Sequence, residues 1–214
     1  MDEIKIKKIK NLNDVKAIFN FMSSTFLQET IKYGEAFVPL HELYESMIDN
    51  LSHDKDLQFY CVVNKQPAGV VISSPLPYDS KALMLNIIAV KDEFRRSGIA
   101  NVLLAEIEMI ARRKGYERIR VRHNYGAEKF FAKNNYALYL ELAIPESLEI
   151  ESVLKLNNLA LQYKSLTKYN NINFVEYVME SADPYVLHYI SRNTPLVKAI
   201  YILEKKFWKR EDLI

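Results

Sequence analysis

The segment of residues 83–115 constrains the fold more than any other part of the chain. It opens with an apolar run, residues 83–90, which only Asn86 interrupts and which is rich in β-branched residues. Such a run is typical of a strand covered on both faces, although a short apolar run alone does not exclude a helix. A polar turn at residues 91–97 follows, and apolar residues then recur on one helical stripe until Gly115, which suits a helix C-cap. The segment therefore predicts a strand, a basic turn and an amphipathic helix.

The junction between the predicted strand and helix has the chemistry of an anion-binding site. The first amides of a helix lack internal acceptors and carry partial positive charge, so a phosphate can accept hydrogen bonds from them. Gly98 carries no Cβ and permits close approach to the backbone, while Arg95 and Arg96 add positive charge. The glycine spacing excludes a P-loop and a Rossmann fingerprint. We expect a phosphate or pyrophosphate here, and the alternative is an ordinary strand-to-helix turn.

Periodicity along the rest of the chain predicts further strands and helices. The expected elements are a half-exposed strand at 4–9, a helix capped by Asn13 or Asp14, a short helix at 40–51, a hairpin of 57–63 and 68–73, a loop with Pro75 and Pro77, a strand at 118–122, a helix at 126–134 and a strand at 137–142. The lysines of the first strand are interpreted as protection of a sheet edge, and contact with nucleic acid is the weaker alternative.

The junction resembles the R/Q-x-x-G-x-G/A motif of the GCN5-related N-acetyltransferase (GNAT) family, with Arg95, Gly98 and Ala100 at its fixed positions. A second block, which begins at Asn124, resembles the N-x-x-A-x-x-F-Y-x-x-x-G-F segment of the same family. The resemblance covers residues 4–142. It implies an α/β acyl-CoA N-acyltransferase fold, in which a mixed central sheet is flanked by helices.

The resemblance also implies where acetyl-CoA binds. In this family the loop holds the pyrophosphate, and free backbone groups of the central strand pair with the pantetheine arm. A backbone amide of that strand would also stabilise the developing oxyanion. The implied cofactor-binding residues are Ile88, Ala89, Val90, Arg95, Arg96, Ser97, Gly98, Ile99, Ala100, Asn124 and Phe131.

The sequence defines the proton-transfer groups less well. Phe131 stands where the family often has a tyrosine general acid, so Tyr125 or unaided departure of the thiolate would have to serve. His123 is the favoured general base because an unperturbed histidine has a pKa of about 6.5. Further candidates for the base are Glu35, His41 and Glu42. Four scattered histidines and one cysteine give no metal-ligand spacing, so no metal site is expected.

The C-terminal third resembles the family less closely. We expect helices at 145–161 and 185–192 and a closing strand at 199–207. The segment before that strand is then a mostly helical insertion. We expect this insertion to shape the acceptor site or a homodimer contact. The competing interpretation is a separate helical appendage at the C-terminus. The expected division is a core, an insertion and a closing strand with a tail, at residues 1–142, 143–197 and 198–214.

Composition and charge limit the classes of protein to which this chain can belong. With 49% hydrophobic and 26% charged residues the chain can bury a normal core, and a net charge of +2 predicts neither a nucleic-acid nor a membrane partner. Cys61 lies in an apolar run and is predicted to be an inert thiol. The resemblance to the GNAT family implies an enzyme that transfers acetyl from acetyl-CoA directly to an amine, either of a small molecule or of a protein, and we expect this enzyme to be cytoplasmic. A non-catalytic acyl-CoA-binding or regulatory module on the same scaffold is the alternative.

Overall fold

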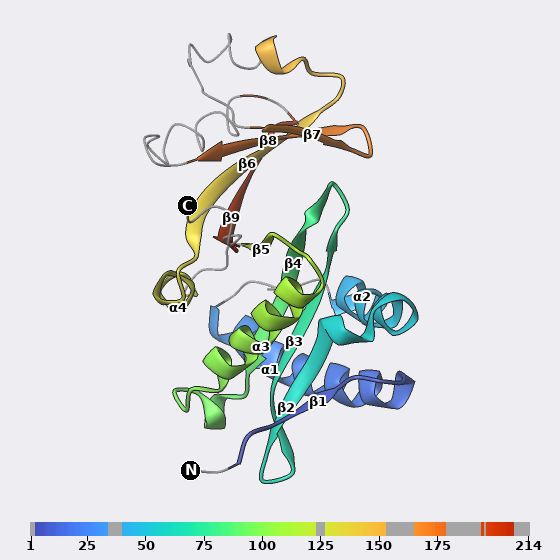
Figure 1. The fold of residues 1–214 in the computed structure, drawn as a ribbon, viewed down its shortest axis with the longest axis vertical. Coiled ribbons are helices and arrows are strands. Elements are labelled where there is room, and N and C mark those ends of the chain that lie inside the picture. Colours follow the sequence, from blue (N-terminus) through green and yellow to red (C-terminus); the bar gives the residue numbers. More distant parts are fainter. Residues whose placement is uncertain are drawn as a thin grey trace. The chain divides into compact units, whose positions relative to one another are not determined.

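The computed structural model describes residues 3–33, 40–122, 127–152, 165–178, 194 and 196–207. The chain forms two compact units, unit 1 with residues 1–75 and 83–119 and unit 2 with residues 76–82 and 120–214. Figure 1 labels their helices and strands. Over the described residues, none of the helices combines the length and the hydropathy needed to cross a membrane.

Unit 1 combines sheet strands with helices. Its elements are β1 (Lys5–Lys8), α1 (Leu12–Tyr33), α2 (Leu40–His53), β2 (Gln58–Val63), β3 (Gln66–Leu76), most of β4 (Asp79–Val90) and α3 (Ile99–Arg113), with short 3-10 turns at Lys55–Leu57 and Asp92–Phe94. The strand order is β1-β2-β3-β4, and both β1 and β3 pair antiparallel with β2. The strand and helix predicted from residues 83–115 are confirmed as β4 and α3.

The predicted hairpin is also confirmed, and its turn is tighter than expected. Asn64 and Lys65 both have positive φ, 50° and 67°, which suits a two-residue turn between twisted strands. The expected loop with Pro75 and Pro77 is wrong at its start, because β3 continues through Pro75 to Leu76. The pairing of β3 with β2 ends at Ile72, so β2 requires no N–H from this proline.

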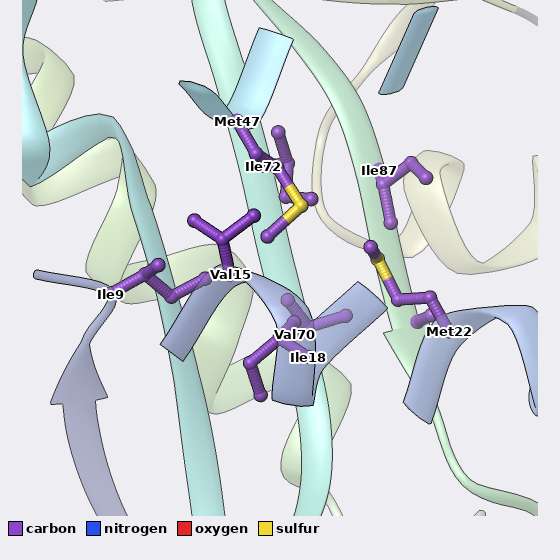
Figure 2. Packing of buried hydrophobic residues seen from close by; sticks show 9 residues of the cluster. Ile9, Val15, Ile18, Met22, Met47, Val70, Ile72 and Ile87 are labelled. Atoms are coloured by element: carbon purple, nitrogen blue, oxygen red, sulfur yellow. The ribbon is translucent and has the colours of Figure 1, made fainter. Parts of the chain in front are cut away.

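A single hydrophobic cluster joins α1 and α2 to one face of the sheet. Its fully or almost fully buried members are Ile9, Val15, Ile18, Met22, Met47, Val70, Ile72, Ile87 and Ala89. Figure 2 shows Met22 pointing toward Ile87 and Met47 lying beside Ile72. The unbranched methionines fill the irregular space between helices and strands. Burial raises the pKa of the Cys61 thiol to about 11, which agrees with the inert role predicted for it.

The N-cap of α1 is Asn11 instead of the predicted Asn13 or Asp14. The Asn11 side-chain oxygen accepts hydrogen bonds from the amides of Asn13 and Asp14, at 2.9 and 3.0 Å. Asp14 in turn accepts a hydrogen bond from the amide of Lys10 at 2.9 Å. The arrangement is similar to a capping box, except that Asp14 accepts from the residue before the N-cap, and it satisfies amides on both sides of the helix start.

The lysine-rich strand β1 lies at one end of the strand order, and its four residues are exposed. The side chain of Lys8 forms an ion pair with Asp56, at 2.5 Å. The hydrogen bond from Lys8 is the main cause that lowers the pKa of Asp56. Lys114, at the end of α3, pairs with Asp54 at 2.8 Å. The position of β1 supports protection of a sheet edge as the role of its lysines.

Unit 2 contains the C-terminal strands. Its elements are part of β5 (Arg118–Arg122), α4 (Glu128–Lys133), β6 (Ala137–Pro145), β7 (Ser165–Tyr169), β8 (Ile172–Val178) and β9 (Lys198–Lys206). β6 pairs antiparallel with both β8 and β9, and β8 pairs antiparallel with β7. The strands predicted at 118–122 and 137–142 are confirmed, as is the closing strand, which is β9. The short helix expected at 126–134 is confirmed as α4, and Asn135, with φ 64°, follows its end.

Residues 165–178 lie in the segment predicted to be mostly helical and form the hairpin of β7 and β8 instead, whereas residues 150–152 are helical as predicted. The turn of the hairpin is made by Asn170 and Asn171, with φ 46° and 61°. Asparagine tolerates this left-handed conformation, and the flanking β-branched and aromatic residues favour strands. Pro145 ends β6 instead of opening a helix, and most of the two predicted helices lies outside the described residues. The division of the chain at residues 142 and 197 stays a prediction.

A buried ionic network holds the strands of unit 2 together. The Arg120 guanidinium, 3% exposed, contacts Glu141 on β6 at 2.5 Å and Glu204 on β9 at 2.6 Å. Asp79 lies 3.8 Å from the same guanidinium. The hydroxyl of Tyr78 donates a hydrogen bond to Glu141 at 3.1 Å, and burial raises its pKa. Charges buried to this degree require partners, because each loses its hydration.

Candidate functional site

The turn between β4 and α3 contains two residues with positive φ, which follow an extended residue. Arg95 is extended, Arg96 has φ 63°, and Gly98 has φ 87° with ψ −4° at the N-cap of α3. A left-handed conformation suits glycine and strains other residues. The chain therefore reverses sharply at these residues, and α3 begins at Ile99.

The amides at the start of α3 are open to a ligand. The Gly98 carbonyl accepts from the amides of Asn101 and Val102, at 3.0 and 3.2 Å. Within the described part of the chain, no group accepts a hydrogen bond from the amides of Gly98, Ile99 or Ala100. A Cβ built on Gly98 would meet no atom within 4 Å. The site predicted at this junction thus has donors, space and the positive end of a helix.

The two arginines of the turn differ in their surroundings. Arg95 is held in place, since its guanidinium contacts Asp92 at 2.8 Å and its Nε donates to the Val90 carbonyl at 3.3 Å. Arg96 is exposed, and among the described residues it has no hydrogen-bond or ion-pair partner. Its charge is available to an anion, whereas that of Arg95 is partly compensated. The Ser97 hydroxyl donates to the carbonyl of Phe94 and so supports the turn.

Gly69 positions the start of α3, and the sequence alone did not identify it. A Cβ on this residue would lie 2.9 Å from the Ala89 carbonyl oxygen, 2.9 Å from Cδ1 of Leu103 and 3.2 Å from Cγ2 of Ile99. Glycine therefore allows β3, β4 and the first turns of α3 to approach closely. The amide of Lys91 also donates to the Ala68 carbonyl at 2.9 Å, which ties the turn to β3. A glycine within a strand pattern is the signal that could have indicated this close approach.

The end of β4 leads directly into this turn. The side chains of Ile87 and Ala89 are buried in the cluster under α1 and α2, while Ile88 and Val90 are half-buried. This alternation is expected of a strand whose two faces have different neighbours. The structure thus brings together the predicted strand residues and the whole predicted loop within unit 1.

The other predicted site residues are placed differently. His123, Asn124, Tyr125 and Glu35 lie outside the described residues, as does the side chain of Glu42, while His41 is exposed on α2. Phe131 in unit 2 is 3% exposed, and its ring contacts those of Phe130 and Tyr136 at centroid distances of 5.1 and 5.2 Å. Burial among aromatic rings gives Phe131 a packing role, and its role toward a cofactor stays a prediction.

Comparison with known families decides the family of this chain. A model of the acetyltransferase (GNAT) family matches residues 18–136, which is more than half of the chain. The chain belongs to the acetyltransferase (GNAT) family. The matched segment contains the end of β4, the turn and all of α3, so the open amides lie within the GNAT region. No curated protein matches the sequence of this GNAT chain.

Solved structures resemble the fold of this GNAT protein at low sequence identity. A protein from Desulfovibrio desulfuricans assigned to the GNAT family has 14% identity and a TM-score of 0.51, over 82% of this chain and 97% of that one. The PaiA N-acetyltransferase of Thermoplasma acidophilum, solved with coenzyme A, has 14% identity and a TM-score of 0.49, over 82% and 98%. A GNAT acetyltransferase of Brucella melitensis, solved with acetyl-CoA, has 18% identity and a TM-score of 0.49, over 64% and 84%. The first of these supports the GNAT fold, and the identities carry no conclusion beyond the fold.

Proposed function

We propose that this protein transfers an acetyl group from acetyl-CoA to an amine by direct transfer. The observation that carries the proposal is the start of α3, where three amides have no acceptor among the described residues, a Cβ on Gly98 would meet no atom within 4 Å, and Arg96 is exposed. A pyrophosphate needs such donors and such charge. Family membership makes acetyl-CoA the pyrophosphate-containing molecule that fits.

Each part of the site has a distinct task in this proposal. The amides of Gly98, Ile99 and Ala100 hold phosphate oxygens, and Arg96 compensates their charge. Backbone groups of Ile88, Ala89 and Val90 pair with the pantetheine arm as an added strand would, and one amide of this stretch stabilises the oxyanion.

Acetyl-CoA supplies a thioester whose carbonyl carbon a neutral amine can attack, and the C–S bond then breaks. The amine must lose one proton in the same reaction, and we assign its removal to His123, whose unperturbed pKa of about 6.5 suits a general base at neutral pH. A His123→Ala variant is expected to lose activity at pH 7 and to regain part of it above pH 9, where more of the acceptor amine is neutral. Equal loss at both pH values would point to a structural role.

The test is release of free CoA thiol from acetyl-CoA in the presence of a panel of amines, followed with a thiol reagent. We expect amine-dependent thiol release, with the acetylated amine confirmed by mass spectrometry. A Gly98→Glu variant, which places a bulky anion at the start of α3, is expected to abolish both turnover and the thermal stabilisation by CoA. Tight binding of acetyl-CoA without transfer to any amine would contradict catalysis and support a non-catalytic acyl-CoA-binding module.

A further inference from the structure

Asn86 is an exposed amide in the interior of an otherwise apolar strand. Its neighbours on β4, Leu85 and Ile87, are 1% and 5% exposed, while Asn86 itself is exposed. Asparagine is disfavoured in strands, and the packing of β4 does not explain the presence of Asn86. Its Nδ2 donates a hydrogen bond to Oγ of Ser74 on β3 at 2.9 Å.

The pair of Asn86 and Ser74 presents unused polar groups. Within the described residues, no donor reaches Oδ1 of Asn86, and no acceptor receives the hydroxyl proton of Ser74. The hydrogen bond between the two side chains fixes the direction of the amide, because Nδ2 is already engaged. The pair therefore offers one oriented acceptor and one donor at the surface of unit 1.

With the pantetheine arm paired along β4 as proposed above, its length brings its sulfur near this pair. The arm has about twelve bonds between its phosphate ester oxygen and its sulfur, which equals about four residues of extended backbone or roughly 13 Å. The phosphate turn meets the strand at Val90, because Nε of Arg95 donates to the Val90 carbonyl. Four residues back along β4 from Val90 is Asn86, on the same side of the strand as Ile88 and Val90.

We propose that Asn86 and Ser74 form the acceptor subsite and that the acceptor is an amine of low basicity, such as an α-amino group. This inference rests on the proposed function. Oδ1 of Asn86 accepts an N–H of the attacking amine and so aims its lone pair, and the Ser74 hydroxyl donates to a carbonyl or similar acceptor next to that amine. Asn86 binds the acceptor and removes no proton, because an amide does not titrate.

The chemistry of the pair selects the class of amine. Residues 83–90 of β4 and 69–76 of β3 include no titratable side chain, so these stretches offer no carboxylate to stabilise an ammonium or to deprotonate it. At pH 7.5 about one third of α-amino groups are neutral, against roughly one in a thousand lysine side chains. Without a nearby base on these strands, the reaction favours the amine that arrives neutral, by a few hundredfold.

The test compares Asn86→Ala, Asn86→Asp and Ser74→Ala with the wild-type chain. The two acceptors are glycinamide, which has an α-amino group, and Nα-acetyl-lysinamide, whose amine is the lysine side chain. Binding of acetyl-CoA is measured separately by calorimetry, and folding by thermal unfolding. Because Asn86 is exposed, all variants are expected to fold and to bind acetyl-CoA within about twofold of wild type.

We expect the wild-type protein to prefer glycinamide at pH 7.5. Asn86→Ala is expected to raise the KM for glycinamide by about five- to tenfold, which corresponds to the loss of one hydrogen bond. Ser74→Ala is expected to have a smaller effect in the same direction. Asn86→Asp supplies a carboxylate and should shift the preference toward Nα-acetyl-lysinamide. An unchanged KM in Asn86→Ala, or a wild-type preference for Nα-acetyl-lysinamide, would overturn the subsite while acetyl-CoA binding stands. Failure of the wild type to bind acetyl-CoA would instead overturn the proposed function.

Discussion

Substitution of Gly69 by alanine tests how the start of α3 is held. The added Cβ would lie 2.9 Å from the carbonyl oxygen of Ala89, which belongs to the backbone and cannot move without distorting β4. It would also lie 2.9 Å from Cδ1 of Leu103, which can rotate, and 3.2 Å from Cγ2 of Ile99. Overpacking of this kind costs about 1–3 kcal/mol, and the lower entropy of the unfolded alanine chain offsets about 0.4–1 kcal/mol. The net expectation is a loss of about 1–2 kcal/mol.

The assay is chemical unfolding followed by circular dichroism, together with the affinity for CoA. The double variant Gly69→Ala/Leu103→Val removes one of the contacting methyl groups and is expected to recover part of the loss, in a double-mutant cycle. Because Ile99 is the first residue of α3, Gly69→Ala should also weaken CoA binding. A variant as stable as wild type, with unchanged affinity, would refute the close approach of β3, β4 and α3.

Three further predictions concern charged residues. Arg120→Met leaves buried carboxylates without their main partner and should destabilise the protein by about 3–5 kcal/mol in thermal unfolding, whereas a change below 1 kcal/mol would contradict the network. The hydrogen bond from Lys8 lowers the pKa of Asp56 in the folded protein below its unfolded value of 3.8. The ionised Asp56 therefore stabilises the fold at pH values above 3.8. This stabilisation is lost as the pH falls through the lower folded pKa. Asp56→Asn should therefore be less stable than wild type at pH 7 by about 0.5–1 kcal/mol, and the difference should disappear as pH falls through the lowered folded pKa. Arg96→Asn, which keeps a residue that tolerates positive φ, should retain stability and weaken CoA binding about three- to tenfold, as measured by calorimetry.

Local features of the chain were sufficient to predict much of unit 1. The apolar run at 83–90 and the amphipathic pattern after it became β4 and α3, and Gly115, with φ 85°, ends the helix as expected. The turn of the first hairpin was recognisable because Asn64 and Pro67, two turn-favouring residues, stand between two strand patterns. In each case the signal and the structure it specifies lie within a few residues of each other.

Predictions failed where neighbouring residues are compatible with more than one local structure. Asn11, Asn13 and Asp14 can all cap a helix, and only the hydrogen bonds reveal that Asn11 does so. Pro75 was interpreted as a loop residue, yet β3 continues through it, beyond the end of its pairing with β2. The hairpin of β7 and β8 carries an Asn-Asn turn signal, but β8 also pairs with β6, which lies more than twenty residues earlier in the chain.

Contacts between residues far apart in the sequence could not be predicted at all. Arg120 and Glu204 are separated by 84 positions, and nothing local to either residue indicates the other. The same holds for Gly69, whose function becomes visible only from its distances to Ala89 and Leu103. In the site, the sequence assigned Arg95 and Arg96 equal roles, while the structure separates a tethered arginine from an exposed one.

The most direct test of the phosphate site compares the two glycines at the ends of α3. Gly98 and Gly115 have almost equal φ, 87° and 85°, and a Cβ on either would meet no atom within 4 Å. Alanine should therefore strain the backbone similarly at both positions, by about 1–2 kcal/mol, while only the first lies beside the open amides. Calorimetric titration with CoA is expected to show at least about tenfold weaker binding for Gly98→Ala and wild-type binding for Gly115→Ala. Wild-type affinity in both variants, or equal loss in both, would contradict a pyrophosphate held at the start of α3.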